Sequence, residues 1–224
     1  MKKLLGRTLR TIGGLLVFSF GTYCTITANI GLGPWECLSM GLSFHVPFSY
    51  GIVHSTVGLI ILALDLVLGE KIGLGTVLDA LLVGNFVDLF DVMGFMPKLQ
   101  ALLPRVGLFV LGLLVLALGQ AIYMSAGLGC GPRDTLMVGL GRRMKHVRIG
   151  LVETAILLTV LLVGWLLGGP VGIGTLIAGL GSGAAMQLVF SLLRFEPRSV
   201  HHESLIDTWR TIVQYAGGRG RTGT

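Results

Sequence analysis

Long apolar stretches alternate with short turns that contain glycine and proline over most of the 224-residue chain. The full-length stretches cover 11–28, 51–68, 75–95, 106–125, 150–167 and 174–193. A helix of about 20 residues crosses the roughly 30 Å hydrocarbon core of a bilayer. Two shorter apolar pieces, 34–45 and 132–144, follow the first stretch of each half, and about 12 helical residues reach only about 18 Å. The pattern predicts an all-α polytopic membrane protein.

The residues that interrupt the helices occur twice at a nearly constant spacing. Gly-Leu-Gly-Pro-Trp-Glu at 31–36 returns as Gly-Cys-Gly-Pro-Arg-Asp at 129–134, a shift of 98. Gly-Leu-Gly-Thr at 73–76 returns as Gly-Ile-Gly-Thr at 172–175, a shift of 99. A duplicated membrane unit that repeats its helix breaks most often builds a path for a solute between the copies. We therefore expect two homologous halves.

The two short pieces are predicted to be re-entrant helices. Pro34 and Pro132 suit the first turn of a helix, where the missing N–H of proline costs nothing. Glu36 and Asp134 then fall in the first turn, where the helix dipole favours a carboxylate. The preceding residues 29–33, if extended, cover roughly 16 Å, which is about half of the membrane. Each half would then hold three full transmembrane helices and one short re-entrant helix.

Basic residues in the connecting segments bear on the topology. The loop at 142–148 is strongly basic, whereas its counterpart at 46–50 has no Lys or Arg. With three crossings per half, the halves insert in opposite orientations as inverted repeats, and the positive-inside rule places both termini and the basic loop in the cytoplasm. The alternative has eight crossing helices arranged as parallel repeats and also places this loop inside.

These patterns divide the chain into five parts. The expected parts are a basic cytoplasmic N-terminus at 1–10, membrane repeat 1 at 11–95, a linker at 96–105, membrane repeat 2 at 106–193 and a polar cytoplasmic tail at 194–224.

Composition narrows the classes of function. Hydrophobic residues make up 53% of the chain and charged residues 12%, so the expected solvent is the lipid bilayer. The net charge of +6 lies in short flanks of the apolar segments, so no nucleic-acid partner is expected. The three cysteines have no metal-binding spacing, and the chain contains no HExxH, GxSxG or P-loop motif. We expect no catalytic residues, no metal and no cofactor, and an intramembrane enzyme is the least favoured class.

The paired Gly-x-Gly-Pro and Gly-x-Gly-Thr turns, together with Gly-Trp-Leu-Leu-Gly-Gly at 164–169, give the chain a likeness to a known group. Over about residues 8–195 it resembles the YczE-like membrane proteins, which are related to the YyaS/YitT group. The resemblance implies a multi-pass protein of the bacterial cytoplasmic membrane. It supplies no assigned substrate and no catalytic residue.

The starts of the two short helices are the predicted substrate-binding region. Unpaired backbone N–H groups at such a start can hold an anionic group, and glycine lets a ligand approach the backbone closely. Arg133 can pair with Asp134 or Glu36 or bind a carboxylate itself. The candidate residues are Gly33, Pro34, Trp35, Glu36, Gly131, Pro132, Arg133 and Asp134. In the alternative interpretation the glycines serve tight packing, the carboxylates cap their own helices, and Arg133 anchors the chain at the membrane interface.

A second set of polar residues at membrane depth is predicted to couple ion or proton movement. Asn85 and Asp88 share a helix face, and Gln187 is the counterpart of Asp88, whereas Asp79 lies on the opposite face of the same helix. The remaining candidates, His54 and Glu153, occupy equivalent positions at an offset of 99. The alternative is that these residues are solvated where their helices end.

The leading hypothesis from the sequence is a secondary transporter or permease. Its substrate would be a small anionic or zwitterionic organic solute bound between the two halves. The alternative is a membrane accessory or scaffold protein that holds a cytoplasmic biosynthetic or regulatory partner through the basic loop and the tail. A homo-oligomer is compatible with both hypotheses.

Overall fold

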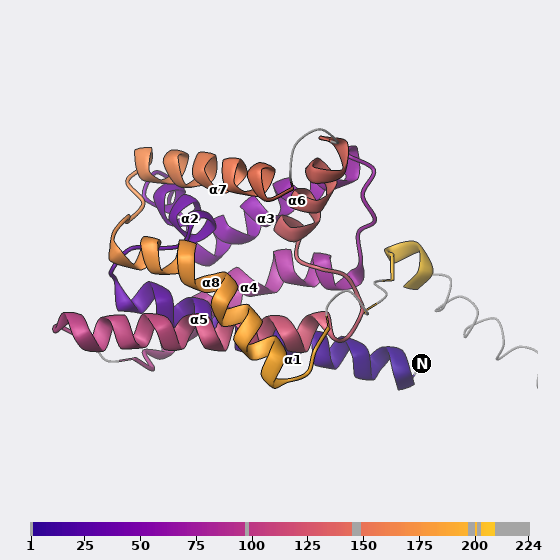
Figure 1. Ribbon diagram of the computed structural model, residues 1–224, viewed down its shortest axis with the longest axis horizontal. Helices are drawn as coiled ribbons and strands as arrows, with labels where there is room; N and C mark the ends of the chain where they lie inside the picture. Colours follow the sequence, from indigo (N-terminus) through magenta and orange to yellow (C-terminus); the bar gives the residue numbers. More distant parts are fainter. Residues whose placement is uncertain (1, 97–98, 145–148, 197–199, 201–202, 209–224) are drawn as a thin grey trace, which may run out of the picture.

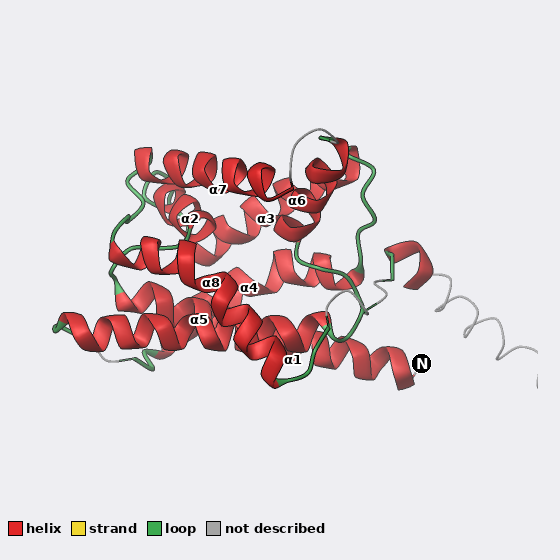
Figure 2. Ribbon diagram, viewed as in Figure 1, coloured by secondary structure: helices red, strands yellow, loops and turns green. Residues whose placement is uncertain are grey.

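The described part of the chain is entirely helical. The computed structural model describes residues 2–96, 99–144, 149–196, 200 and 203–208, in which Figure 2 shows helices and loops only. The eight labelled helices are α1 (Lys2–Ala28), α2 (Pro34–Ser43), α3 (Tyr50–Val67), α4 (Leu74–Met93), α5 (Leu102–Met124), α6 (Pro132–Arg143), α7 (Ile149–Leu166) and α8 (Ile173–Leu192). One further helical turn covers 205–208. The prediction of an all-α protein is confirmed.

Four of the described helices, α1, α3, α5 and α8, are long and apolar enough to cross a membrane. Six crossings were predicted. The other two predicted crossings correspond to α4 and α7. Helix α4 carries Asp79, Asp88 and Asp91, and the apolar segment of α7, Gly150–Leu166, is shorter than those of the four candidate spans. Large apolar side chains such as Val67, Val92 and Leu103 are more than four-fifths exposed on the outer surface, as expected for side chains that face lipid.

An antiparallel pair, α1 and α5, forms one side of the molecule (Figure 1). Arg7, near the start of α1, donates from Nε to the carbonyl oxygen of Ala126 beyond the end of α5 at 2.7 Å. Arg105, near the start of α5, donates to the carbonyl oxygen of Ala28 at the end of α1, also at 2.7 Å. The two arginines are 98 residues apart, so equivalent positions make reciprocal contacts.

Glycine allows the backbones of α1 and α5 to touch. A Cβ atom on Gly21 would lie 2.7 Å from the carbonyl oxygen of Gly112, and a Cβ atom on Gly112 would lie 2.9 Å from that of Gly21. Gly14 and Gly119 form a second contact of the same kind. Small residues at helix interfaces permit such close approach inside a membrane.

The other helices are arranged around this pair. Helix α4 packs on α1 and α8 packs on α5, while α3 packs on α4. The two short helices lie on the other side of the molecule, where α2 packs on α7 and α3, and α6 packs on α3 and α7 (Figure 1).

The duplicated turns bind each other across the two halves. The amide of Gly174 donates to the carbonyl oxygen of Ile30 at 2.7 Å, and the amide of Gly75 donates to that of Leu128, also at 2.7 Å. Gly31 and Gly129 have φ values of 107° and 121°, which side chains rarely adopt. Each Gly-x-Gly-Pro turn therefore packs on the Gly-x-Gly-Thr turn of the other half, and this contact fixes where α2 and α6 begin.

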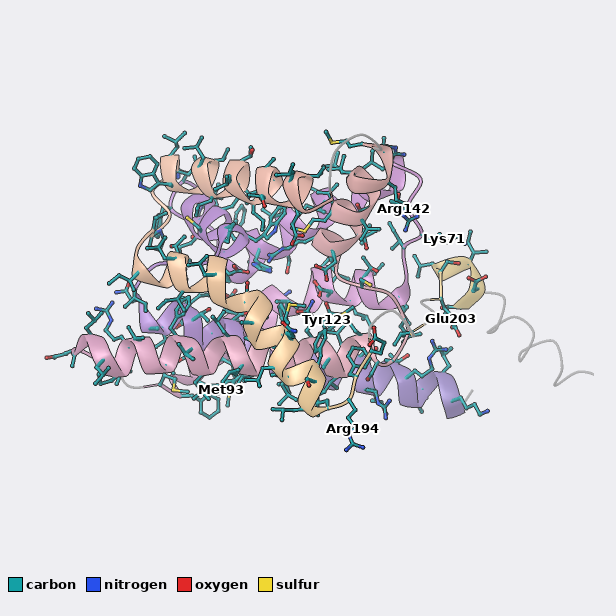
Figure 3. All side chains as sticks on the ribbon, in the orientation of Figure 1. Lys71, Met93, Tyr123, Arg142, Arg194 and Glu203 are labelled. Carbon is teal, nitrogen blue, oxygen red and sulfur yellow. The ribbon has the colours of Figure 1, made fainter. Side chains whose placement is uncertain are left out.

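The described part of the tail returns to the body of the protein. Glu203 pairs with Arg7 at 2.5 Å, and the amide of Leu205 donates to the carbonyl oxygen of Ile72 at 2.8 Å. These contacts lie at the end of the molecule where α1 begins, which we call the N-terminal end; Glu203 is labelled there in Figure 3. The rest of the tail, at 209–224, and most of the basic loop, at 145–148, lie outside the described residues.

A pair of neighbouring substitutions tests the packing of α1 on α5. In Gly14→Ala the new Cβ would lie 2.5 Å from the amide nitrogen of Tyr123. Overpacking of this kind costs about 1–3 kcal/mol, so we expect a lower unfolding temperature of the purified protein in detergent. In the control, Gly13→Ala, no atom lies within 4 Å of the new Cβ, and stability should be unchanged or slightly higher. Equal unfolding temperatures for the two variants would contradict this packing.

Candidate functional site

A cavity of about 260 Å³ lies between the α1–α5 pair and the short helices. All eight labelled helices, α1 to α8, contribute residues to its wall. Tyr123, near the centre of the view in Figure 3, is one of them. The wall carries the carboxylates Glu36, Asp79, Asp134 and Glu153 together with Arg133. A polar cavity of this size between transmembrane helices can hold a small molecule.

Both short helices begin at this cavity because of their prolines. Pro34 and Pro132 occupy the first helical position, and the preceding Gly33 and Gly131 are extended. The next residues, Trp35 and Glu36 in α2 and Arg133 and Asp134 in α6, therefore lie in the first turn of each helix and line the cavity.

Arg133 joins the two short helices. Its Nη1 donates to Oε1 of Glu36 at 2.9 Å, and each of the two side chains is 17% exposed. The guanidinium carbon also lies 5.3 Å from the centre of the Trp35 ring, a cation–π contact. The pairing of Arg133 with Glu36, one of the two partners expected from the sequence, is present, and the guanidinium lies between protein groups rather than on the surface.

The second amino group of Arg133, Nη2, contacts His54. Nη2 of Arg133 lies 2.8 Å from Nε2 of His54, and the hydroxyl of Tyr50 lies 3.0 Å from Nδ1. Nη2 also lies 3.3 Å from Nδ1 of His54, and because arginine can only donate, a hydrogen bond between the two side chains requires a neutral histidine with an acceptor nitrogen. Each amino group of Arg133 thus contacts a protein side chain, and within the described part of the chain the other N–H donors of the guanidinium remain available.

The acidic residues of α4 and α6 lie around Gly131. A Cβ atom on Gly131 would lie 3.2 Å from Oδ2 of Asp79 and 3.5 Å from the hydroxyl of Tyr123. Asp134 accepts from Nε2 of Gln120 at 3.4 Å. A larger residue at position 131 would therefore reduce the space beside Asp79.

The structure brings ten of the thirteen predicted site residues to one cavity. They are Gly33, Pro34, Trp35, Glu36, His54, Gly131, Pro132, Arg133, Asp134 and Glu153. Asn85, Asp88 and Gln187 do not line it. Oδ1 of Asp88 instead accepts from the amide of Gly51 at 2.8 Å, Nδ2 of Asn85 donates to Oγ of Ser55 at 3.5 Å, and Gln187 is exposed on α8.

Five polar residues of the wall were not among the predicted ones: Thr25, Asp79, Gln120, Tyr123 and Ser182. The repeat relates three of them to other wall residues, but the counterparts were not predicted site residues either, so the repeat provided no signal for them. Tyr123 is the counterpart of Thr25 at an offset of 98, and Asp79 is the counterpart of Ala178 at an offset of 99, and all four line the cavity. Among the described residues, no group of His, Cys, Asp and Glu is placed to hold a metal ion.

The similarity to known proteins covers most of the helical part of the chain. Residues 5–191 match a family described as "Family of unknown function (DUF6198)". The chain is 31% identical to the "Uncharacterized membrane protein YczE" of Bacillus subtilis over 185 residues, which cover 80% of this chain and 82% of that protein. It is 30% identical to the "Uncharacterized protein YyaS" of the same organism over 167 residues, 73% of this chain and 82% of that protein.

An "Uncharacterized protein" of Haemophilus influenzae is also 30% identical, over 179 residues that cover 80% of this chain and 81% of that protein. No solved structure matches the chain. The predicted resemblance to YczE and YyaS is confirmed, and with the long apolar helices it identifies a membrane protein.

A double-mutant cycle tests the ion pair between the short helices. Glu36→Gln leaves the Arg133 charge without its carboxylate, and Arg133→Gln leaves the Glu36 charge without its cation. Removing one partner of a fully buried ion pair costs about 3–5 kcal/mol. This pair is partly buried, with 17% of each side chain exposed, so each variant should lose less than that and still unfold at a lower temperature. The double variant should lose less stability than the two single losses combined. Additive losses would show that the two residues do not interact.

Proposed function

The chain belongs to the DUF6198 family of unknown function, and we propose that this membrane protein is a secondary transporter or permease for a small solute. The observation that carries the proposal is the polar cavity in which Arg133 of α6 meets Glu36 of α2. Charged groups are costly at membrane depth and commonly mark the path of a substrate or ion.

We infer that the two halves are inverted repeats, each with three long helices and one short re-entrant helix. The antiparallel course of α1 and α5, which are equivalent at an offset of 98, supports this arrangement. The reciprocal contacts of the duplicated turns support it as well. Transporters with inverted repeats bind their substrates near the middle of the membrane, where broken helices begin.

Charge in the cavity favours a zwitterion over a simple anion. The wall holds four carboxylates and one arginine, and that arginine already binds Glu36 and His54. Glu36 already balances the charge of Arg133, so a simple anion would face the remaining carboxylates of the wall without a compensating positive charge. A positively charged amine has Asp79 and Asp134 available, since neither is paired with a cation among the described residues. The solute we propose carries an amine for these aspartates together with a carboxylate, which the remaining N–H donors of Arg133 can bind.

Solute binding can be measured without transport. We expect millimolar zwitterions such as free amino acids, but not a dicarboxylate such as succinate, to raise the unfolding temperature of the purified protein. A ligand at 100 times its Kd stabilises a protein by about 2.7 kcal/mol, which is a shift of several degrees. Asp79→Asn should abolish the shift, and the control Asp91→Asn, on the same helix but outside this cavity, should keep it. A shift with succinate alone would contradict the proposed solute class.

Uptake separates a transporter from a scaffold. Arg133→Ala should abolish uptake of the stabilising solute into proteoliposomes while the protein stays in the membrane. The control Arg142→Ala removes an exposed arginine that pairs with Glu70 at 3.5 Å, and it should transport normally. If the cellular role survives Arg133→Ala but is lost when the tail from residue 197 is removed, the scaffold hypothesis holds and the transporter proposal fails.

A further inference from the structure

Helices α3 and α4 pack closely against each other at the end of the molecule opposite the N-terminal end, and we call this pair closed. A Cβ atom on Gly84 would collide with the carbonyl oxygen of Gly51, and one on Gly51 would collide with that of Gly84. One turn further along α4, Asp88 accepts from the amide of Gly51 in the first turn of α3 at 2.8 Å. A carboxylate there satisfies an amide that has no partner within its helix and interacts favourably with the helix dipole.

The equivalent pair, α7 and α8, is open. The counterparts of Gly51, Gly84 and Asp88 at an offset of 99 are Gly150, Gly183 and Gln187. All three are exposed, and no atom lies within 4 Å of a Cβ built on either glycine. Among the described residues, α7 and α8 are not a packed pair, and in Figure 1 they diverge towards the N-terminal end.

The gap between α7 and α8 leads to the cavity. Glu153 and Leu157 of α7 and Gly179 and Ser182 of α8 line it. Position 157 is the counterpart of Gly58, and position 179 is the counterpart of Ala80. In the closed pair a Cβ atom built on Gly58 would lie 3.2 Å from the Cα of Ala80. Leucine at 157 adds more volume than the change from alanine to glycine at 179 removes, so α7 and α8 stay farther apart at this level than α3 and α4 do. The close approach seen between α3 and α4 is therefore available to α7 and α8 at Gly150 and Gly183, where both residues are glycine as in the closed pair.

We infer that α7 and α8 form a gate that closes as α3 and α4 do, and that the structure holds the cavity open towards the N-terminal end. This inference rests on the proposed transporter, because a solute carrier exposes its site to one side at a time. In the closed state Gly150 meets Gly183, and the amide oxygen of Gln187 accepts from the first turn of α7. A neutral amide binds less strongly there than the carboxylate of Asp88, which is why this gate is the open one.

Paired cysteines report both gates without any solute. They are placed in a background in which Cys24, Cys37 and Cys130 are alanine and whose unfolding temperature is verified. Ser55→Cys with Asn85→Cys joins two side chains that touch in the structure, whereas Thr154→Cys with Ala184→Cys occupies the equivalent, exposed positions of the open pair. Copper phenanthroline should oxidise the first pair to a disulfide rapidly and the second only in the fraction of molecules whose α7–α8 gate closes.

Two matched glycine variants should move the 154–184 cross-link in opposite directions. Gly84→Ala disrupts the closed α3–α4 pair, so the 154–184 yield should rise at least threefold. Gly183→Ala touches nothing in the open state but prevents close packing, so the yield should fall at least threefold. Gln187→Asp restores the carboxylate of the closed pair and should raise the yield.

These outcomes separate the gate from the transporter. A 154–184 yield that none of the three variants changes, or that Gly84→Ala and Gly183→Ala change in the same direction, overturns the gate. Solute-induced stabilisation in the same protein would then leave the site intact. If the cross-links respond as expected but no solute stabilises the protein or enters proteoliposomes, the gate holds and the proposed transport fails.

Discussion

The structure depends on the need of a membrane-embedded backbone to find partners for its N–H and C=O groups within the protein. A helix break within the hydrocarbon region has no water to satisfy those groups. The carbonyl oxygens of Ile30 and Leu128 receive the amides of Gly174 and Gly75 instead. Each break is thus satisfied by the other half, so neither half completes its backbone pairing alone, and the cavity forms where the two short helices begin.

The two halves make equivalent backbone contacts, but the side chains that they contribute to the cavity differ. Trp35 and Arg133 are equivalent positions, and their divergence allows one ring to lie beside one cation. His54 and Glu153 are equivalent too, yet the histidine is bound to Arg133 and Tyr50 while the glutamate is exposed at the gap between α7 and α8. A repeated backbone with diverged side chains yields one asymmetric site, which fits the zwitterionic solute that we propose.

The sequence predicted the helices well because their signals are local. Apolar length and the two prolines place the starts of α2 and α6 at Pro34 and Pro132, as observed. Helix α1 begins at Lys2 rather than near residue 11, and Arg7 in this extension binds Ala126, a contact that no local pattern reveals. The sequence also did not show which face of α4 points into the cavity. Asp79 and Asp88 were correctly expected on opposite faces, but only tertiary packing decides that Asp79 faces the cavity and Asp88 caps α3.

The inverted arrangement of the halves is tested most directly by the sides on which two equivalent connections lie. Single cysteines at Val46, after α2, and at Met144, after α6, can be labelled with a membrane-impermeant maleimide in right-side-out and inverted vesicles, in a background without native cysteines. The account predicts labelling from opposite sides, with Met144→Cys on the cytoplasmic side. Labelling of both positions from the same side would contradict it, because parallel repeats of eight crossing helices place both connections together.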